Sequence, residues 1–385
     1  MNKIFGFTGA KQIIFGNGSI SRLAETVQQL GCTRPLLVMD RNLLKTEIKD
    51  QVTTVLKKAK LPSVQFAEID GEPELELADT GAKLAAKEKC DGVIGVGGGS
   101  AMDAAKAISV LLSNKGKASD YLGLNKVPGP GVPKIMVPTT AGTGSEVTFT
   151  AVFIRKELRK KEGMNSPYLY PEVALLDPVL TLSLPPEPTA ATGMDALCHA
   201  IESFTSVNAN PMSELFSLEA IRLISDNLRT CVHNGKDLDA REQMLLGALY
   251  AGLGLANAGV GAAHSLSYPL GGLFGIGHGI ANTLMLPGIM AFNLPSALER
   301  FAIIADAMGE VIDDMPLRDS AYLAIDAVEN LIDDCGIRRN LSQYGIAEEH
   351  LPMLARIAMT VTRPLENNPR KVTVDDAVEI YKEIL

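Results

Sequence analysis

Short apolar runs alternate with amphipathic stretches over the first half of the chain. The run Pro35–Asp40 (PLLVMD) is apolar at nearly every position, as expected of a strand buried on both faces of a parallel sheet. Residues 77–89, rich in Ala and Lys, and residues 100–113 predict helices. The predicted strands are 35–40, 92–97, 134–138 and 173–177. Strands that alternate with helices predict βαβ units and a mostly parallel sheet.

The pattern changes at the proline cluster LPPEP, residues 184–188. Beyond it the strand signals stop, and residues 189–385 consist of successive helical patterns interrupted by Gly, Pro and Asn. We therefore predict an α/β domain with a Rossmann-like, mostly parallel sheet over residues 1–185. An all-α domain is predicted over residues 186–385.

Composition narrows the class of protein. With 385 residues and 46% hydrophobic content, the chain can bury a large core. It has no run of 18 apolar residues and no signal-peptide core, and its five cysteines are scattered without CxxC spacing. The basic run of residues 155–161 is short and contains Glu157, which favours a solvated loop over a nucleic-acid patch. We expect a cytoplasmic protein with reduced thiols that binds neither nucleic acid nor membranes.

Three glycines and a serine, Gly97-Gly98-Gly99-Ser100, lie between a predicted strand and a predicted helix. Glycines let the backbone approach a pyrophosphate, and a helix N-terminus favours an anion. Ser100 could cap the helix, and Asp103 could complete a capping box or bond the ligand. We interpret Gly97, Gly98, Ser100 and Asp103 as candidate cofactor-binding residues. A tight turn without a ligand is the alternative.

A second polar loop, PTTAGTGSE over residues 138–146, also follows a predicted strand. Its hydroxyls suit contacts to a nucleotide, although a polar loop that caps the next helix is the alternative. Asp40 ends the first predicted strand, where a carboxylate could accept hydrogen bonds from a ribose and repel a 2′-phosphate. This position favours NAD over NADP, unless Asp40 is simply a turn residue.

Histidine is rare, with five in the chain, and four of these, His199, His233, His264 and His278, occur within one window of about 80 residues. Asp195 and His199 are spaced i, i+4, so they share a helical face. His264 and His278 follow, each among glycines and alanines. One carboxylate and three imidazoles could hold a divalent cation, with Fe²⁺, Zn²⁺, Mn²⁺, Co²⁺ and Ni²⁺ all suitable. Hydrogen-bonded core histidines and an ordinary helical Asp–His pair remain the alternative.

Together these segments resemble the iron-containing (group III) alcohol dehydrogenase family, along essentially the whole chain. The residues that carry the resemblance are GGGSAMDAAK (97–106), PTTAGTGSEV (138–147), GMDALCHAIE (193–202), His264, HGIAN (278–282) and NPR (368–370). The resemblance implies the dehydroquinate synthase-like architecture, with a dinucleotide-binding α/β domain before a helical metal-binding and substrate domain. It also implies NAD as cofactor, Fe²⁺ as the metal, and a homodimer or larger assembly.

The resemblance also assigns roles to individual positions. The metal ligands would be Asp195, His199, His264 and His278. Thr139, Thr140 and Thr143 would lie beside the nicotinamide half of the cofactor, and Lys161 and Leu180 would approach the dinucleotide. Three departures from the family matter. Tyr268 stands where members often have a second histidine that aids proton transfer, and Glu72-Pro73 replaces an Asn-Pro element on the adenosine side. Gly277 precedes the last ligand histidine, where members commonly have proline.

We therefore expect hydride transfer between NAD(H) and a small primary alcohol or aldehyde, including action as an aldehyde reductase. Tyr268, a water or the nicotinamide ribose could relay the proton. In a narrower version the substrate is a short anionic aldehyde, carboxylate or sulfonate, held by Arg363, unless Arg363 is a surface or salt-bridge residue. Phe149 is a further candidate substrate contact. Two different functions stay open: an enzyme of the glycerol dehydrogenase or dehydroquinate synthase type, and a nucleotide-binding relic without catalysis.

Overall fold

The computed structural model describes residues 4–158 and 160–385. The described residues form two compact units. One unit is Gly9–Leu184, and the other is Pro185–Leu385 together with the N-terminal segment that ends at Thr8. Within the helical unit, the backbone N–H of Thr8 donates to the side chain of Asn257, which anchors that segment.

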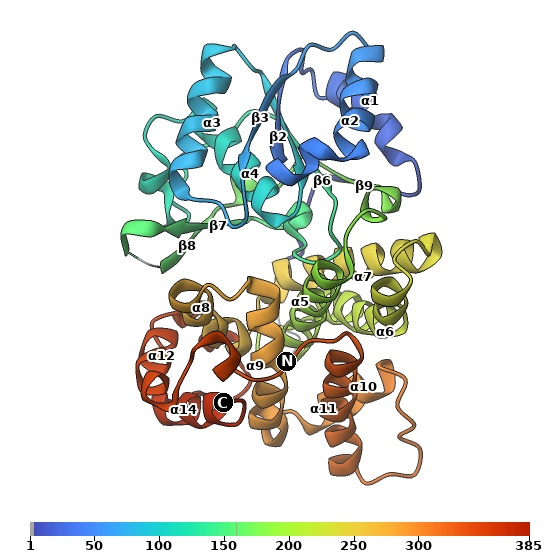
Figure 1. The fold of residues 1–385 in the computed structure, drawn as a ribbon, viewed down its shortest axis with the longest axis vertical. Helices are drawn as coiled ribbons and strands as arrows, with labels where there is room; N and C mark the ends of the chain where they lie inside the picture. Colours follow the sequence, from blue (N-terminus) through green and yellow to red (C-terminus); the bar gives the residue numbers. More distant parts are fainter. Residues whose placement is uncertain (1–3, 159) are drawn as a thin grey trace. The chain divides into compact units, whose positions relative to one another are not determined.

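The unit Gly9–Leu184 is built around a parallel sheet (Figure 1). Its six strands in the described residues run in the order β1-β9-β6-β4-β2-β3, and every neighbouring pair is parallel. The strands are β1 (Gln12–Phe15), β2 (Pro35–Asp40), β3 (Val64–Ile69), β4 (Gly92–Gly97), β6 (Lys134–Pro138) and β9 (Val173–Leu176). The predicted parallel sheet is therefore confirmed.

Helices cover both faces of this sheet (Figure 1). Side chains alternate along β2: Leu37 and Met39 join the core on one face, and Leu36 and Val38 join the core on the other. Helices α1 (Leu23–Gln29) and α2 (Glu47–Lys58) contribute to the first core, whereas α3 (Leu75–Lys87) and α4 (Gly99–Ser113) contribute to the second. Burial on both faces explains why the central strands are apolar at every position.

The sheet has a switch point between β2 and β4. From β2 the chain continues through α2 to the edge strand β3, but from β4 it continues through α4 in the opposite direction, to β6. Because α2 and α4 lie on opposite faces, the carboxyl ends of β2 and β4 are left open between them. Open α/β sheets bind their ligands at such a point.

A small second sheet orders β5 (Gly123–Leu124), β8 (Lys160–Asn165) and β7 (Thr150–Arg155), with β7 and β8 antiparallel. Within the described part of the basic run, Arg155 ends β7, residues 156–158 form a 3₁₀ turn, and residues 160 and 161 begin β8, so the predicted loop is wrong in part. Pairing of β7 with β8 extends the strands into the run. Arg159 lies outside the described residues, but Lys156 and Lys161 form ion pairs with Glu74 and Glu72.

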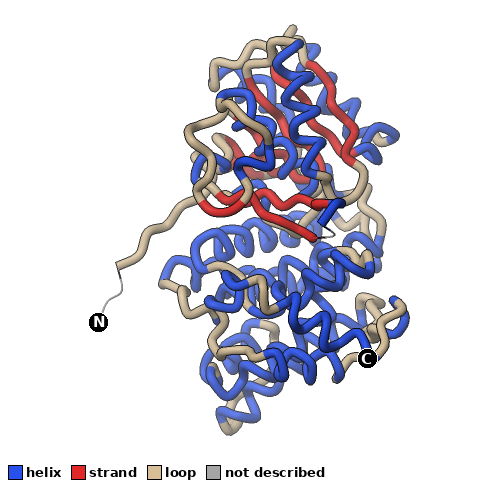
Figure 2. Tube along the Cα trace, turned by 90° about the vertical axis from the view of Figure 1, so that its left-hand side faces the viewer, coloured by secondary structure: helices blue, strands red, loops and turns tan. Residues whose placement is uncertain are grey.

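The second unit is helical, as predicted, and Figure 2 shows no strand in its described part. Its helices are α5 (Pro186–Thr205), α6 (Pro211–His233), α7 (Leu238–Ala258), α8 (Ala262–Phe274), α9 (His278–Asn293), α10 (Leu298–Ala307), α11 (Leu317–Asp334), α12 (Leu351–Ala358), α13 (Thr362–Asn367) and α14 (Val374–Lys382). The predicted fold class is therefore confirmed.

Helix α5 lies at the centre of this unit and packs against α6, α7 and α9. It begins with Pro186 at its first position, where a missing N–H costs nothing, and residues 193–205 are all buried. A helix enclosed on every side explains why this segment lacks a polar stripe. The polar side chains it does carry must therefore find partners inside the core.

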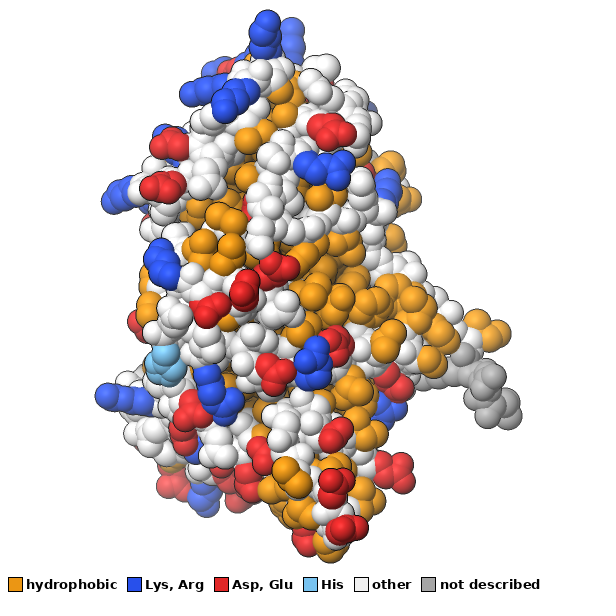
Figure 3. Space-filling view, turned by 90° about the vertical axis from the view of Figure 1, so that its right-hand side faces the viewer, with side chains coloured by type: hydrophobic (Ala, Val, Ile, Leu, Met, Phe, Trp, Pro, Cys, Tyr) orange, Lys and Arg blue, Asp and Glu red, His pale blue; other side chains and the backbone are white. Residues whose placement is uncertain are grey.

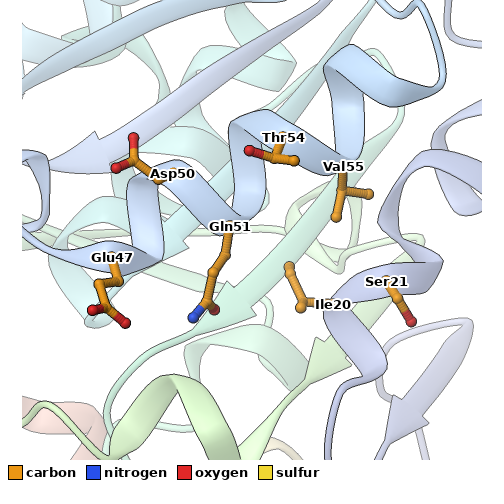
Figure 4. Close-up of a pocket in the computed structure, with 7 residues that line it drawn as sticks. All are labelled: Ile20, Ser21, Glu47, Asp50, Gln51, Thr54 and Val55. Carbon is orange, nitrogen blue, oxygen red and sulfur yellow. The ribbon is translucent and has the colours of Figure 1, made fainter.

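The surface carries acidic and basic side chains interspersed on the face drawn in Figure 3. A hollow of about 410 Å³ lies between α2 and the 3₁₀ helix Ser19–Arg22 (Figure 4). Its lining includes Glu47 and Asp50 but no cation, so it does not suit a phosphate. Among the described helices, none alone is long and apolar enough to cross a membrane; α7 and α8 pass together by length and composition, but with a bend of 105°.

Candidate functional site

Asp195, His199, His264 and His278 come together inside the helical unit. Helix α5 presents Asp195 and His199 one turn apart, α8 presents His264, and His278 is the first residue of α9. One ligand-type atom from each lies within 4.8 Å of all the others. The Nε2 atoms of His199 and His278 lie 3.8 and 3.9 Å from Asp195 Oδ1.

The four side chains of this cluster differ in how far they are exposed to solvent. Asp195, His199 and His264 are each less than 5% exposed, whereas the side chain of His278 is 33% exposed. Burial by itself raises the pKa of the Asp195 carboxyl, but the three imidazoles and the amide of Asn282 outweigh it and hold the pKa below its usual value. The cluster thus keeps a buried anion and opens toward solvent at His278.

The amide of Asn282, one turn after His278 on α9, reaches the same cluster. Its Nδ2 lies 2.7 Å from Asp195 Oδ1, 3.0 Å from His264 Nε2 and 3.2 Å from His278 Nε2. An amide has two hydrogens, so it cannot satisfy three acceptors at once. The surplus of acceptors around one point is the arrangement that a divalent cation satisfies, and these residues therefore fit a bound metal.

Glu202, one turn after His199 on α5, contacts the other side of His264. One carboxylate oxygen accepts a hydrogen bond from the backbone N–H of Ala263 at 2.7 Å, and the other meets Nδ1 of His264. Glu202 is 4% exposed. Its carboxylate and that of Asp195 therefore flank the His264 ring from opposite edges.

Tyr268 and Arg363 lie in the same unit. The ring of Tyr268, on α8 one turn after His264, is half-buried with its centroid 6.2 Å from that of His278. Arg363 is exposed on α13, and α13 packs against α8. The structure thus brings Tyr268 to the cluster and leaves Arg363 on the surface of a neighbouring helix.

In the other unit, Asp40 meets the glycine loop, residues 97–100, at the switch point of the sheet. The backbone N–H of Gly98 donates to Asp40 Oδ2 at 2.8 Å. Gly97 has φ +149°, and a Cβ there would lie 2.1 Å from the same oxygen, so this position requires glycine. Burial raises the pKa of Asp40 to about 6, with Asp70 adding to the rise and the Gly98 N–H opposing it.

Helix α4 begins at Gly99, so its N-cap is Gly98 and not Ser100. The predicted serine cap is wrong, because the helix starts one residue earlier and places Ser100 inside the first turn. No side chain in the described residues caps this end. The first-turn N–H groups therefore point out of the helix toward the switch point, where a phosphate would be stabilised.

Asp103 holds the hydroxyl loop, residues 139–145, against α4. Its carboxylate accepts hydrogen bonds from Ser145 Oγ at 2.6 Å and from the Val152 N–H at 2.8 Å. Lys106 Nζ lies 3.4 Å from Asp103 Oδ1. These contacts, rather than the predicted capping box, occupy the carboxylate. Beneath the loop, burial raises the pKa of Glu146 to about 7, while its own backbone N–H and Lys106 oppose the rise.

The hydroxyl loop follows β6 and lies beside the glycine loop. Thr139 donates its N–H to the Gly97 carbonyl at 2.9 Å, and Thr143 packs directly over Gly99. The Oγ1 atom of Thr140 is buried near Gly98, yet within the described residues it has no hydrogen-bond partner. A buried hydroxyl in this state is a ready donor for a ligand.

The remaining predicted residues of this unit differ in their surroundings. The Leu180 side chain is 1% exposed and packs in the core, so only its backbone could face a ligand. Lys161, a predicted cofactor-binding residue, places its Nζ 2.6 Å from Oε1 of Glu72. Glu72 belongs to the Glu72-Pro73 pair that replaces the Asn-Pro element of the family. Phe149 is half-buried, with its ring centroid 5.6 Å from that of Tyr170.

Sequence reasoning missed Glu202, Asn282 and Glu146. Glu202 follows Asp195 and His199 at i+7 and i+3, and three polar residues on one face of an otherwise apolar helix were an available signal. Asn282 is spaced i+4 from His278, which is the same local rule. Glu146 gave no signal, since only the structure shows that it is fully buried.

Comparison with known proteins agrees with this geometry. The family "Iron-containing alcohol dehydrogenase" matches residues 10–178, and "Fe-containing alcohol dehydrogenase family, C-terminal" matches residues 189–385. Long-chain-alcohol dehydrogenase 1 of Geobacillus thermodenitrificans is 40% identical over 370 residues, which cover 95% of this chain and 93% of that one.

Solved structures give the same result. A 1,3-propanediol oxidoreductase has a TM-score of 0.97 and 36% identity, with full coverage of both chains. A sulfoacetaldehyde reductase from Bifidobacterium kashiwanohense in complex with NAD⁺ has a TM-score of 0.90 and 29% identity, covering 100% of this chain and 99% of that one. The chain therefore belongs to the iron-containing alcohol dehydrogenase family, and the predicted enzyme class, alcohol dehydrogenase, is confirmed.

Proposed function

We propose that this enzyme transfers a hydride between NAD(H) and a small primary alcohol or aldehyde, with one divalent metal held by Asp195, His199, His264 and His278. The observation that carries the proposal is the convergence of four ligand-type atoms within 4.8 Å, three of them imidazole nitrogens. Membership of an iron-containing family makes Fe²⁺ the proposed metal. We also propose a homodimer or larger homo-oligomer.

Bound metal would supply a Lewis acid for the alcohol or carbonyl oxygen, and NAD(H) would exchange the hydride. The chain's own contribution is positioning. Helix α5 is enclosed by its neighbours and holds Asp195 and His199, while the side-chain amide of Asn282 donates to Asp195 Oδ1. The partial exposure of His278 marks the edge where a small substrate can enter. Tyr268 lies beside that edge, where its hydroxyl is the proposed proton-holding group.

The cofactor proposal rests on the switch point of the parallel sheet. Asp40 would accept hydrogen bonds from the adenosine ribose, and its charge would disfavour the 2′-phosphate of NADP. The uncapped first turn of α4 and the backbone of Gly97 and Gly98 would receive the pyrophosphate. Thr140 offers its hydroxyl to the same ligand. A structural relative bound to NAD⁺ supports this choice of cofactor.

The test replaces His264 by Ala in protein loaded anaerobically with Fe²⁺. We expect turnover on a panel of small alcohols and aldehydes to disappear and bound metal to fall well below the wild-type amount, with NADH binding retained. His233→Ala is the matched control, because its imidazole contacts the Asp334 carbonyl in the same unit. Wild-type turnover and metal content in His264→Ala would overturn the ligand assignment.

A narrower substrate class, short aldehydes that carry a carboxylate or sulfonate, is the second candidate. It is favoured by the position of Arg363 on α13, which packs against the helix that bears His264, and by the likeness to a sulfoacetaldehyde reductase. Arginine binds such anions in a bidentate manner. In Arg363→Ala, kcat/KM should fall about tenfold or more for the anionic aldehydes but not for neutral ones of equal length. Equal losses on both would reject this candidate.

A further inference from the structure

Glu202 is buried behind His264, on the edge of the ring that faces away from Asp195. Resting on the metal site proposed above, we propose that Glu202 is a positioning residue for the metal: it fixes both the tautomer of His264 and the first turn of the helix that carries it. Glu202 itself is not among the ligands. Its effect on the metal passes through the imidazole.

The tautomer of His264 follows from the contacts on both ring nitrogens. Asn282 approaches Nε2 at 3.0 Å with its amide nitrogen, which can only donate, so Nε2 is an acceptor. A neutral imidazole with an acceptor at Nε2 carries its proton on Nδ1. That N–H donates to the Glu202 carboxylate, which can only accept. The lone pair of Nε2 is thereby directed at the point shared with Asp195 and His278.

The same carboxylate fixes the backbone beneath His264. The N-cap of helix α8 is Gly261, which has no side chain of its own with which to cap the first turn. Its two leading N–H groups are bonded from elsewhere: Ala263 donates to Glu202 Oε1 at 2.7 Å, and Ala262 donates to Asn368 Oδ1 at 3.2 Å. Glu202 therefore holds the ring and the residue before it through two oxygens of one carboxylate.

A second metal site formed by Cys198, Glu202 and His264 is the competing interpretation, because these groups also cluster. The contacts argue against it. Both oxygens of Glu202 and Nδ1 of His264 are already engaged in hydrogen bonds, and Cys198 Sγ is 4.0 Å from Nδ1. The carboxylate–imidazole pair is instead the arrangement that orients a histidine ligand.

The variant Glu202→Gln tests the inference. Glutamine has nearly the same shape, but an NH₂ group replaces one of the two oxygens that accept from the Ala263 N–H and from His264 Nδ1, so a donor would face one of these two positions. Facing Nδ1 with its NH₂ group would force the opposite tautomer, which points a hydrogen at the metal position. Asn368→Ala is the matched control, because it removes the other cap of α8 and leaves the His264 ring untouched.

We would measure Co²⁺ affinity by chelator competition and the visible absorption of the Co²⁺ protein. Glu202→Gln should bind Co²⁺ about 10–100-fold more weakly, with an altered spectrum, while Asn368→Ala keeps the wild-type affinity and spectrum. Wild-type affinity and spectrum in Glu202→Gln would overturn the inference. An equal loss in Asn368→Ala would also overturn it, by showing that general loosening of α8 is enough.

The wild-type protein gives an independent test should Glu202→Gln fail to fold. ¹⁵N-histidine NMR, assigned with His264→Ala, should show His264 protonated on Nδ1, and protonation on Nε2 would refute the inference. Failure of the proposed function looks different: wild type and His264→Ala would then bind Co²⁺ equally well.

Discussion

Gly279, the second residue of α9, lies against the backbone of α5. A Cβ built on Gly279 would be 2.3 Å from the carbonyl oxygen of Ala191 and 3.4 Å from Cβ of Asp195. Real Cβ contacts essentially never fall below 3.0 Å, and the obstructing atom is backbone. In Gly279→Ala, the start of α9 must therefore move away from α5 by about 0.7 Å or more.

This displacement separates His278 from Asp195, whose facing atoms are 3.9 Å apart. Productive sites are held to within about 0.5 Å, so the proposed metal should bind about 10–100-fold more weakly. Overpacking should also cost about 1–3 kcal/mol of unfolding free energy, which for a unit of this size lowers Tm by roughly 2–12 °C.

Gly277→Ala is the matched control two residues earlier. Gly277 has φ −56°, and a Cβ there would meet nothing within 4 Å, so alanine should be tolerated. The assay compares thermal unfolding by circular dichroism and Co²⁺ affinity in both variants. If Gly279→Ala matches Gly277→Ala in both measurements, the close contact between α9 and α5 does not control the site.

Three further predictions concern the α/β unit. Asp40→Ala should reduce the kcat/KM preference for NAD⁺ over NADP⁺ by about tenfold or more; an unchanged ratio would exclude Asp40 from cofactor selection. Thr140→Val should weaken NADH binding about 2–10-fold in a fluorescence titration without lowering Tm, because the hydroxyl has no partner in the described residues; a lower Tm with unchanged affinity would contradict this. The raised pKa of Glu146, about 7, means that the folded state binds a proton more tightly than the unfolded state, so its contribution to stability is lost as pH rises from about 4.5 through 7. Glu146→Gln should therefore gain Tm relative to wild type between pH 5 and pH 8, and parallel Tm curves would refute that assignment.

The central strands could be predicted because each is buried on both faces, which leaves an unbroken apolar run in the sequence. Strand β3 could not, since it lies at the sheet edge and alternates polar with apolar residues, as in Gln65 and Phe66. Strand β8 could not be predicted either, because its lysines give it no apolar pattern. Its position depends on pairing with β7 and on the ion pair of Lys161 with Glu72. Edge and hairpin strands are specified by partners that a local pattern does not contain.

Some features of the candidate site could also be predicted from local sequence patterns, whereas others depend on distant parts of the chain. Asp195 and His199 could be paired from helical spacing alone. His264 and His278 could be added only because histidine is rare and glycines and alanines surround them, and then from the order of the family motifs. The orientation of His264 by Glu202, and the reach of Asn282 across the cluster, depend on how α5, α8 and α9 pack. For Leu180, the resemblance predicts a position near the dinucleotide, but its side chain packs in the core. A position that matches the family can therefore still direct its side chain away from the ligand.

The burial of α5 also bears on how the enzyme can evolve. Asp195, His199 and Glu202 belong to a helix that is buried on every side over residues 193–205, so a mutation there would disturb both folding and the proposed chemistry, and selection would act against it on either count. The side chain of Arg363 on α13 is exposed, so the packing of a buried helix does not constrain it in the same way. Under the proposed function, substrate preference could therefore change through substitutions around α13 while the metal site on α5 stays the same.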